Sequence, residues 1–412
     1  MTDPTSSVAG FRFAGVSCGI KPKTAAYGDR ALDLALIISD RPCNAAGVFT
    51  QNRFPAAPVL FDKQTLAQNP RGIQAVVINA GNANACTGAQ GLANAAASAH
   101  LVEQAAGLPA GSTLVLSTGV IGLPLPMEKI EAGIRDAGVL ARSVPPGGFA
   151  QTGQNSEGLT LASQAIMTTD TKPKTASRQV GAATVLGIAK GAAMIHPNMA
   201  TLLAVVVTDA AVEPDFLQAM LRRAADRSFN AITVDGDQST NDTLLVLANG
   251  LAGMVDPAAF EQALTEVCQS LAQQMVRDAE GASKFVTVRV TGATDDLAAR
   301  AVAKSVATSV LFKTAVYGGD PNWGRVLMAA GNSGAAIDPG RVALWFAGNG
   351  GQLLQVVANG APLRYAETDA AAIFACTDLD VRLDLGAGGA EATVWTSDLT
   401  HDYVTLNAHY RT

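Results

Sequence analysis

The chain has 412 residues and a formal net charge of −6 at pH 7, with 48% hydrophobic and only 16% charged residues. This length exceeds one ordinary hydrophobic core and predicts two domains or lobes, while the acidic balance argues against a nucleic acid or an anionic membrane as partner. No apolar run approaches the roughly 18 residues that span a bilayer, and the N-terminus has no signal or transit pattern, so we expect a cytoplasmic protein.

Cysteine and histidine are sparse and scattered. The five cysteines form no CxxC pair, and no His/Cys spacing typical of a metal site occurs. We therefore expect buried thiols and no metal or organic cofactor. The chain has only four histidines, so there are few candidates for a histidine-based catalytic triad.

The first third alternates short apolar runs with Gly/Asn/Pro loops. Strands are predicted at Leu34–Ile38, Ala75–Ile78 and Thr113–Leu116, and a helix at Gly91–Ala106. The third strand runs into Ser117–Gly122, a strand-to-glycine turn that exposes backbone N–H groups. Such a turn can stabilise an oxyanion, although a plain turn around Gly119 is the commoner explanation.

The rest of the chain also alternates strands and helices, and this pattern predicts an α/β protein. The segment 145–169 is interpreted as a polar connection, and 313–325 as a loop. A strand is predicted around Val286–Val290, and helices at Glu213–Phe229, Pro257–Ala279 and Asp295–Val310, the last with Thr294 as its N-cap.

The central stretch is Lys190–Ala210. Pro197 excludes a continuous helix before Ala200, and the apolar residues from Leu202 predict a strand that is buried on both faces. An intact threonine hydroxyl is a weak nucleophile. If the bond between Ala200 and Thr201 is cut, Thr201 gains an α-amine with a pKa near ~8 that can act as general base for its own Oγ. Alternatively, Thr201 simply begins the strand.

The string KGAAMIHPNMATLL, which contains this Ala-Thr pair, closely resembles the self-cleavage site of the ornithine acetyltransferase (glutamate N-acetyltransferase) family of arginine biosynthesis. One departure is Ala193, where the family usually has glycine. The resemblance covers essentially the whole chain, because further segments match in the same order: 117–122, 167–171, 229–242, 278–284, 313–325 and 402–412.

The resemblance implies specific roles for individual residues. Thr201 would be the nucleophile, and Thr118 and Gly119 the oxyanion hole. The implied substrate-binding residues are Thr168, Lys190, Thr201, Glu280, Asn407 and Thr412. Thr169 is adjacent to Thr168 and equally a threonine, so the choice between the two stays open.

The resemblance also implies the fold and the reaction. The fold would be a layered α/β sandwich of the N-terminal-nucleophile-like type with a second, smaller α/β lobe. Self-cleavage would give an α chain, 1–200, and a β chain, 201–412, which assemble as an α2β2 heterotetramer. The expected reaction is acetyl transfer from N2-acetylornithine to glutamate through an acetyl-Thr201 ester, and acetyl-CoA as a second donor stays open.

Two alternatives remain at this point. In an N-terminal-nucleophile amidohydrolase or aminopeptidase, water instead of glutamate would resolve the acyl-enzyme. A non-enzymatic carbohydrate- or peptide-binding α/β protein would keep one intact chain. The opposite charges of Lys190 and Glu280 suit a carboxylate and an amine on one amino-acid substrate, which favours the transferase.

Overall fold

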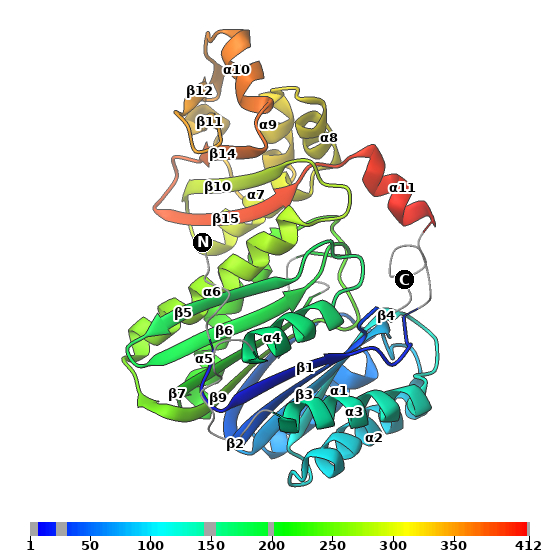
Figure 1. Ribbon diagram of the computed structural model, residues 1–412. Helices are drawn as coiled ribbons and strands as arrows, with labels where there is room; N and C mark the ends of the chain where they lie inside the picture. Colours follow the sequence, from blue (N-terminus) through cyan, green and yellow to red (C-terminus); the bar gives the residue numbers. More distant parts are fainter. Residues whose placement is uncertain (1–6, 22–30, 144–153, 197–201, 410–412) are drawn as a thin grey trace.

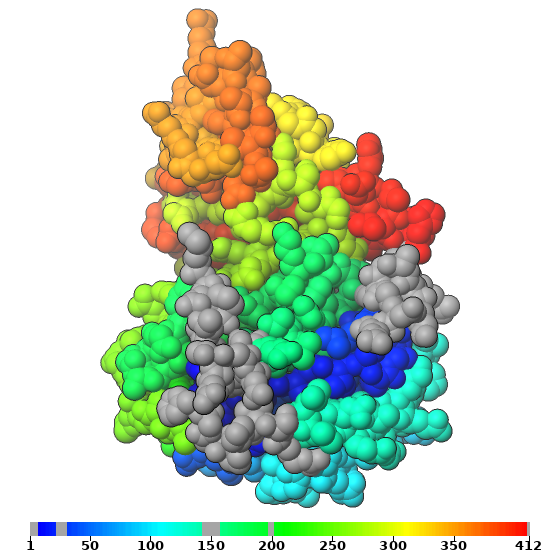
Figure 2. Space-filling view, viewed as in Figure 1, coloured from blue at the N-terminus to red at the C-terminus, as the bar shows by residue number. Residues whose placement is uncertain are grey.

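The computed structural model describes residues 7–21, 31–143, 154–196 and 202–409 (Figure 1). Two β-sheets with their covering helices form a broad lower lobe and a narrower upper lobe. Figure 2 shows the upper lobe, orange in its outer part, standing on the broader lobe, with the red C-terminal segment projecting at one side. The predicted α/β class with a second, smaller lobe is confirmed.

The lower lobe is built on an eight-stranded sheet. Its path is β4-β3-β2-β9-β7-β6-β5, and β1 pairs with β2. The strands are β1 (Phe11–Val16), β2 (Leu34–Phe49), β3 (Ile73–Asn82), β4 (Thr113–Val120), β5 (Lys174–Val180), β6 (Ala183–Lys190), β7 (Leu203–Ala211) and β9 (Thr243–Met254). Strand β7 is antiparallel to β6 and parallel to β9, so it lies in the middle of the sheet.

The composition of β7 explains this central place. Successive residues point to opposite faces of a sheet, and both faces of β7 are covered. Ala204 and Val206 belong to one hydrophobic core, whereas Leu203, Val205 and Val207 belong to the core on the other face. The prediction of a strand buried on both faces is thereby confirmed.

Helices cover both faces of this sheet. On one face α5 packs against β2, and α6 against β5 and β6. Helices α3 and α4 pack against opposite faces of β1 and β2: α3 shares a core with Leu36 and Ile38, and α4 shares a core with Ala35 and Ile37. The helices of this lobe are α1 (Ala57–Gln68), α2 (Gly88–Ala106), α3 (Met127–Ser143), α4 (Gln154–Ala165), α5 (Pro214–Asp226) and α6 (Pro257–Arg277).

The upper lobe has a seven-stranded sheet in the order β13-β12-β11-β14-β10-β15-β8. Its strands are β8 (Ile232–Thr233), β10 (Phe285–Ala293), β11 (Ala343–Gly348), β12 (Leu354–Ala358), β13 (Ala361–Pro362), β14 (Asp378–Asp384) and β15 (Ala390–Ser397). Its helices are α7 (Asp296–Thr308), α8 (Val310–Gly318), α9 (Trp323–Gly331) and α10 (Glu367–Phe374), and α11 (His401–His409) follows β15. Two short 3-10 turns lie at Phe229–Ala231 and Pro339–Arg341.

Three predictions about local structure were wrong. The polar connection 145–169 contains helix α4, which packs against β1 through a narrow face of small and aliphatic residues, including Leu159 and Ala162. The predicted loop 313–325 is mostly helical, because its Gly and Asn residues cap α8 and α9: Gly319 is left-handed, and the Asn322 side chain accepts from the Arg325 N–H. Asp295, not Thr294, is the N-cap of α7.

Candidate functional site

A cavity of about 400 Å³ opens at the edge of the large sheet where β4 and β6 end and β7 and β9 begin. Seven regions meet there: the residue after β3, the end of β4, the loop before β5, the end of β6 with the residues after it, the segment before β9, the residues after α6, and α11. The lining residues are Ala83, Thr118, Gly119, Ile121, Thr168, Thr169, Lys190, Ala193, Met194, Asp235, Asp237, Gln238, Ser239, Thr240, Asn241, Glu280, Tyr403 and Asn407.

Most of the site residues expected from the sequence meet in this cavity. The lining includes Thr118, Gly119, Thr168, Lys190, Glu280 and Asn407. Thr169 lines it too, so the choice between the two threonines stays open. Ala200, Thr201 and Thr412 lie outside the described residues.

Thr118 and Gly119 belong to the last residues of β4 and line the cavity. Gly119 has φ +131°, and a Cβ there would lie 2.3 Å from the carbonyl carbon of Gly81, so only glycine fits. The buried ammonium of Lys190 donates to Thr118 Oγ1 at 3.3 Å. Because that bond uses the hydroxyl oxygen only as an acceptor, the hydroxyl hydrogen of Thr118 remains a donor for a substrate oxygen.

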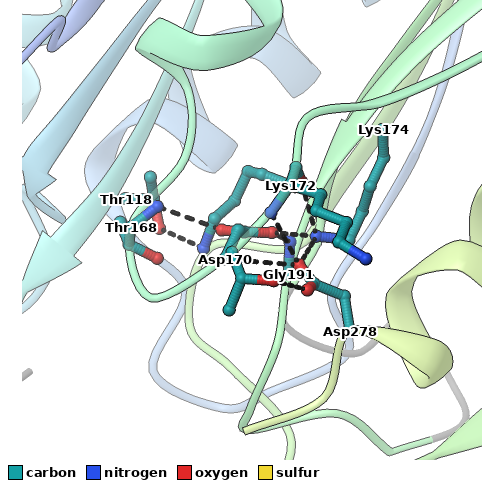
Figure 3. A network of polar contacts seen from close by, with 9 residues as sticks. Thr118, Thr168, Asp170, Lys172, Lys174, Gly191 and Asp278 are labelled. Atoms are coloured by element: carbon teal, nitrogen blue, oxygen red, sulfur yellow. Dashed lines mark hydrogen bonds and ion pairs between the residues drawn. The ribbon is translucent and has the colours of Figure 1, made fainter.

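A buried polar network fixes the loop before β5 against the end of β6 (Figure 3). The Asp170 carboxylate accepts from the Thr168 N–H at 3.0 Å and from the Gly191 N–H at 2.7 Å. Lys174 Nζ donates to Asp170 Oδ1 and to Asp278 Oδ2, both at 2.6 Å. Asp278 also accepts from the backbone N–H and the hydroxyl of Thr171.

The buried charges of this network shift the pKa values of Asp170 and Lys190. Burial alone would raise the pKa of Asp170, but Lys190 and Lys174 outweigh it and lower that pKa to about 2. Burial lowers the pKa of Lys190 below its usual value of 10.5, and Lys174 lowers it further, while Asp170 is the strongest influence that raises it. Asp170 is therefore shared by Lys190 and Lys174, and Lys174 has Asp278 as a second carboxylate partner.

The C-terminal helix completes the wall of the cavity. Asn407 Nδ2 on α11 donates to Glu280 Oε2 at 2.8 Å, and the Glu280 backbone N–H donates to the Ala192 carbonyl at 2.9 Å. Tyr403, one turn earlier on α11, donates its hydroxyl to Asp235 Oδ2 at 3.2 Å. Asn407 therefore lies in the cavity wall beside Glu280.

Several lining or supporting residues were missed by the sequence analysis. Asp170 lies within the segment 167–171 that matches the family, but no role was assigned to it, and Lys174 follows it with no periodic signal. Asn241 donates from Nδ2 to the carbonyls of Ala83 and Ser117, and so fixes the turn after β4. These links join residues more than one hundred positions apart in the chain, and local patterns do not reveal them.

The cavity therefore combines the threonine hydroxyl and glycine at the end of β4, the buried cation Lys190, and the Glu280 carboxylate, which accepts from the amide of Asn407. Among the described residues no three His, Cys, Asp or Glu side chains gather as a metal site would need. The part of the chain covered by the structure also contains no helix that is long and apolar enough to cross a membrane.

Comparison with known proteins places the chain in a family. The model of the ArgJ family matches residues 12–412. The chain belongs to the ArgJ family. It is 45% identical to the mitochondrial arginine biosynthesis bifunctional protein ArgJ of Heterostelium pallidum, over 98% of this chain and 94% of that one. It is 46% identical to the ArgJ protein of Thermotoga neapolitana, over 98% and 99% of the two chains.

A solved ArgJ structure was also matched. The crystal structure of the arginine biosynthesis bifunctional protein from Bacillus halodurans is 38% identical, with a TM-score of 0.46, over 49% of this chain and 96% of that one. Membership of the ArgJ family confirms the family resemblance on which the sequence-based site assignment rests.

Proposed function

We propose that this ArgJ-family chain is a glutamate N-acetyltransferase that moves the acetyl group of N2-acetylornithine to glutamate. Its relatives carry the name arginine biosynthesis bifunctional protein. The observation that carries the proposal is the meeting of six expected residues from distant stretches of the chain around one cavity: Thr118, Gly119, Thr168, Lys190, Glu280 and Asn407.

The first half-reaction uses Thr201 as nucleophile after self-cleavage. Its Oγ attacks the acetyl carbonyl and transfers its proton to its own α-amine, and the C–N bond to ornithine then breaks as the ornithine nitrogen takes up a proton. The negative charge on the carbonyl oxygen would be stabilised by Thr118 and Gly119. One such donor typically contributes about 3 kcal/mol to the transition state.

The second half-reaction reverses these steps with glutamate. Its amine attacks the acetyl-Thr201 ester, and the threonine hydroxyl leaves with N-acetylglutamate as product. Lys190 would bind the α-carboxylate that both amino acids carry, and Glu280, held by Asn407, would bind the amine of ornithine. Thr168 and Thr412 complete the proposed substrate site.

Self-cleavage at Ala200-Thr201 would give chains 1–200 and 201–412. Both chains would contribute strands to the large sheet: β6 of the first pairs with β7 of the second, and β2 of the first with β9 of the second. We therefore expect the two chains to stay together and to form an α2β2 assembly. We further propose that acetyl-CoA serves as a second acetyl donor. We also propose that the protein is located in the cytoplasm.

Two measurements test the proposal together. A denaturing gel with N-terminal sequencing should show two fragments, the second beginning with Thr201. Release of ornithine from N-acetylornithine should then be compared with and without glutamate. Continued release, beyond the first equivalent of ornithine per active site, that depends on glutamate and yields N-acetylglutamate supports the transferase, whereas equal continued release with acetate as product would indicate the amidohydrolase. An intact chain after long incubation would contradict the mechanism.

A further inference from the structure

One short segment, Thr233–Thr243, holds the backbone on both sides of the proposed cleavage site. It contacts Met194 and Ile195 upstream and Leu202 downstream. The upstream contacts lie near one end of the segment and the downstream contacts at the other.

The upstream contact consists of four hydrogen bonds to the backbone of Met194 and Ile195. The two oxygens of Asp235 accept from the Met194 N–H at 2.5 Å and from the Ile195 N–H at 2.9 Å. The Ile195 carbonyl accepts from the Val234 N–H at 2.8 Å and from Thr233 Oγ1 at 3.1 Å. Both hydrogen-bonding groups of the Ile195 backbone are therefore fixed.

This contact holds a backbone conformation that is costly for its residue. Met194 has φ +56°, in the left-handed region that non-glycine side chains rarely adopt. Such conformations persist where the surroundings enforce them, and they concentrate at functional sites. The Asp235 carboxylate enforces this one by accepting two successive N–H groups. Tyr403 and the Asp237 N–H donate to the same carboxylate.

In the downstream contact, too, an aspartate of the segment accepts from a backbone N–H and a backbone N–H of the segment donates to the carbonyl. The Leu202 N–H donates to Asp242 Oδ1 at 3.1 Å, and the Leu202 carbonyl accepts from the Thr243 N–H at 3.1 Å. Asp242 is fully buried and lies in the same segment as Asp235. Two aspartates of one segment therefore hold residues five positions before Ala200 and one position after Thr201.

We propose that Asp235 is a positioning residue for self-cleavage, with Asp242 holding the other end of the loop. This inference rests on the proposed function, since it assumes that the Ala200-Thr201 bond is cut. Attack of a hydroxyl on the preceding carbonyl needs a narrow range of geometries, and a chain held at both ends samples fewer conformations than a free one. The segment Thr233–Thr243 supplies both holds.

The test is the rate of cleavage of Asp235→Asn. The amide keeps the shape but turns one acceptor into an N–H₂ donor, so at least one charge-assisted bond to Met194 or Ile195 is lost. We expect cleavage to be about 10- to 100-fold slower than in the wild-type chain. The full-length chain is made by cell-free synthesis with a short labelling pulse, and loss of the uncut band is followed on a denaturing gel.

Asp209→Asn is the matched control. Asp209 is also buried, and its carboxylate also accepts two backbone N–H groups, from Thr184 at 2.7 Å and Ala9 at 3.4 Å. It lies near the end of β7 that is distant from the cavity. This variant should lose stability in the same way but cleave at the wild-type rate.

Rescue by a second substitution separates positioning from general destabilisation. Glycine adopts the left-handed conformation without the steric cost of a side chain, so Met194→Gly should restore about 5-fold or more of the rate lost in Asp235→Asn. Met194→Gly alone gives the baseline for this comparison. General loss of folding would not be repaired by a glycine in the loop.

Thr233→Val provides a variant that keeps the fold. It removes the hydroxyl that donates to the Ile195 carbonyl and that lies 3.4 Å from Nδ1 of His196, and we expect cleavage about 2- to 10-fold slower. The inference is overturned if Asp235→Asn and Thr233→Val both cleave at the wild-type rate, or if Asp209→Asn is slowed as much as Asp235→Asn. A wild-type chain that never cleaves would instead overturn the proposed function.

Discussion

Replacing Lys174 by methionine should destabilise the protein strongly, although no part of Lys174 lines the candidate cavity. Its side chain is 1% exposed and contacts two carboxylates, Asp170 and Asp278, each at 2.6 Å. Methionine preserves the apolar length of the side chain but removes the charge. Two acidic groups would then lose their shared cation in a buried place.

The magnitude follows from the burial and from the pKa of Asp170. Removing one partner of a buried pair typically costs about 3–5 kcal/mol, because the other charge stays buried without compensation. The pKa of Asp170 falls from 3.8 to about 2 in the folded chain. By linkage this shift contributes about 2 kcal/mol that is present above pH 4 and is lost as the pH falls from about 4 to 2.

Urea unfolding followed by circular dichroism gives the assay, with all samples at one protein concentration because association of cleaved chains affects stability. We expect the free energy of unfolding of Lys174→Met at pH 7 to be about 3 kcal/mol or more below wild type. Its loss of stability between pH 4 and 2 should be smaller than that of wild type. Lys172→Met is the control, because Lys172 is exposed, and it should change stability by less than about 0.5 kcal/mol. Equal effects of the two substitutions would refute the reasoning.

Three further predictions concern substitutions at the site, and a fourth concerns the pairing of the two chains. Lys190→Ala should mainly raise KM for substrates with an α-carboxylate, whereas Thr118→Ala should lower kcat about 100-fold with little change in KM; a correctly processed Thr118→Ala with full kcat would exclude the oxyanion role. Asn407→Ala should raise KM for N-acetylornithine about 2- to 10-fold, because Glu280 loses its amide donor; unchanged steady-state kinetics would remove α11 from the substrate site. The two chains should co-elute in size exclusion in native buffer, and free, folded 1–200 would contradict the interleaved sheet.

The sequence predicted the central strand and six of the residues that line the cavity for different reasons. The apolar composition of Leu202–Val207 predicts burial on both faces by itself, and β7 confirms it. The site residues were named from the match to family motifs. That these residues lie close together in space depends on the order of the strands in the sheet. Antiparallel pairing of β6 with β7 brings Lys190 to the edge of the sheet near the cleavage site.

Other features could not be predicted from local patterns. Helix α4 was missed because its buried face consists largely of small residues, and α8 and α9 because their caps resemble loop residues. The roles of Asp170 and Lys174 depend on partners from three elements, and a sequence pattern gives no sign of them. The contact of Asp235 with Met194 likewise depends on tertiary structure.

The central claim is an acetyl group carried on the first residue of the second chain. The cleaved protein should be incubated with N-acetylornithine in the absence of glutamate, quenched in acid, and its intact chains weighed by mass spectrometry. We predict a fraction of chain 201–412 heavier by one acetyl group, with the modification on the Thr201 side-chain oxygen and discharged when glutamate is added. An unmodified second chain, in protein that releases ornithine only when glutamate is present, would contradict the account.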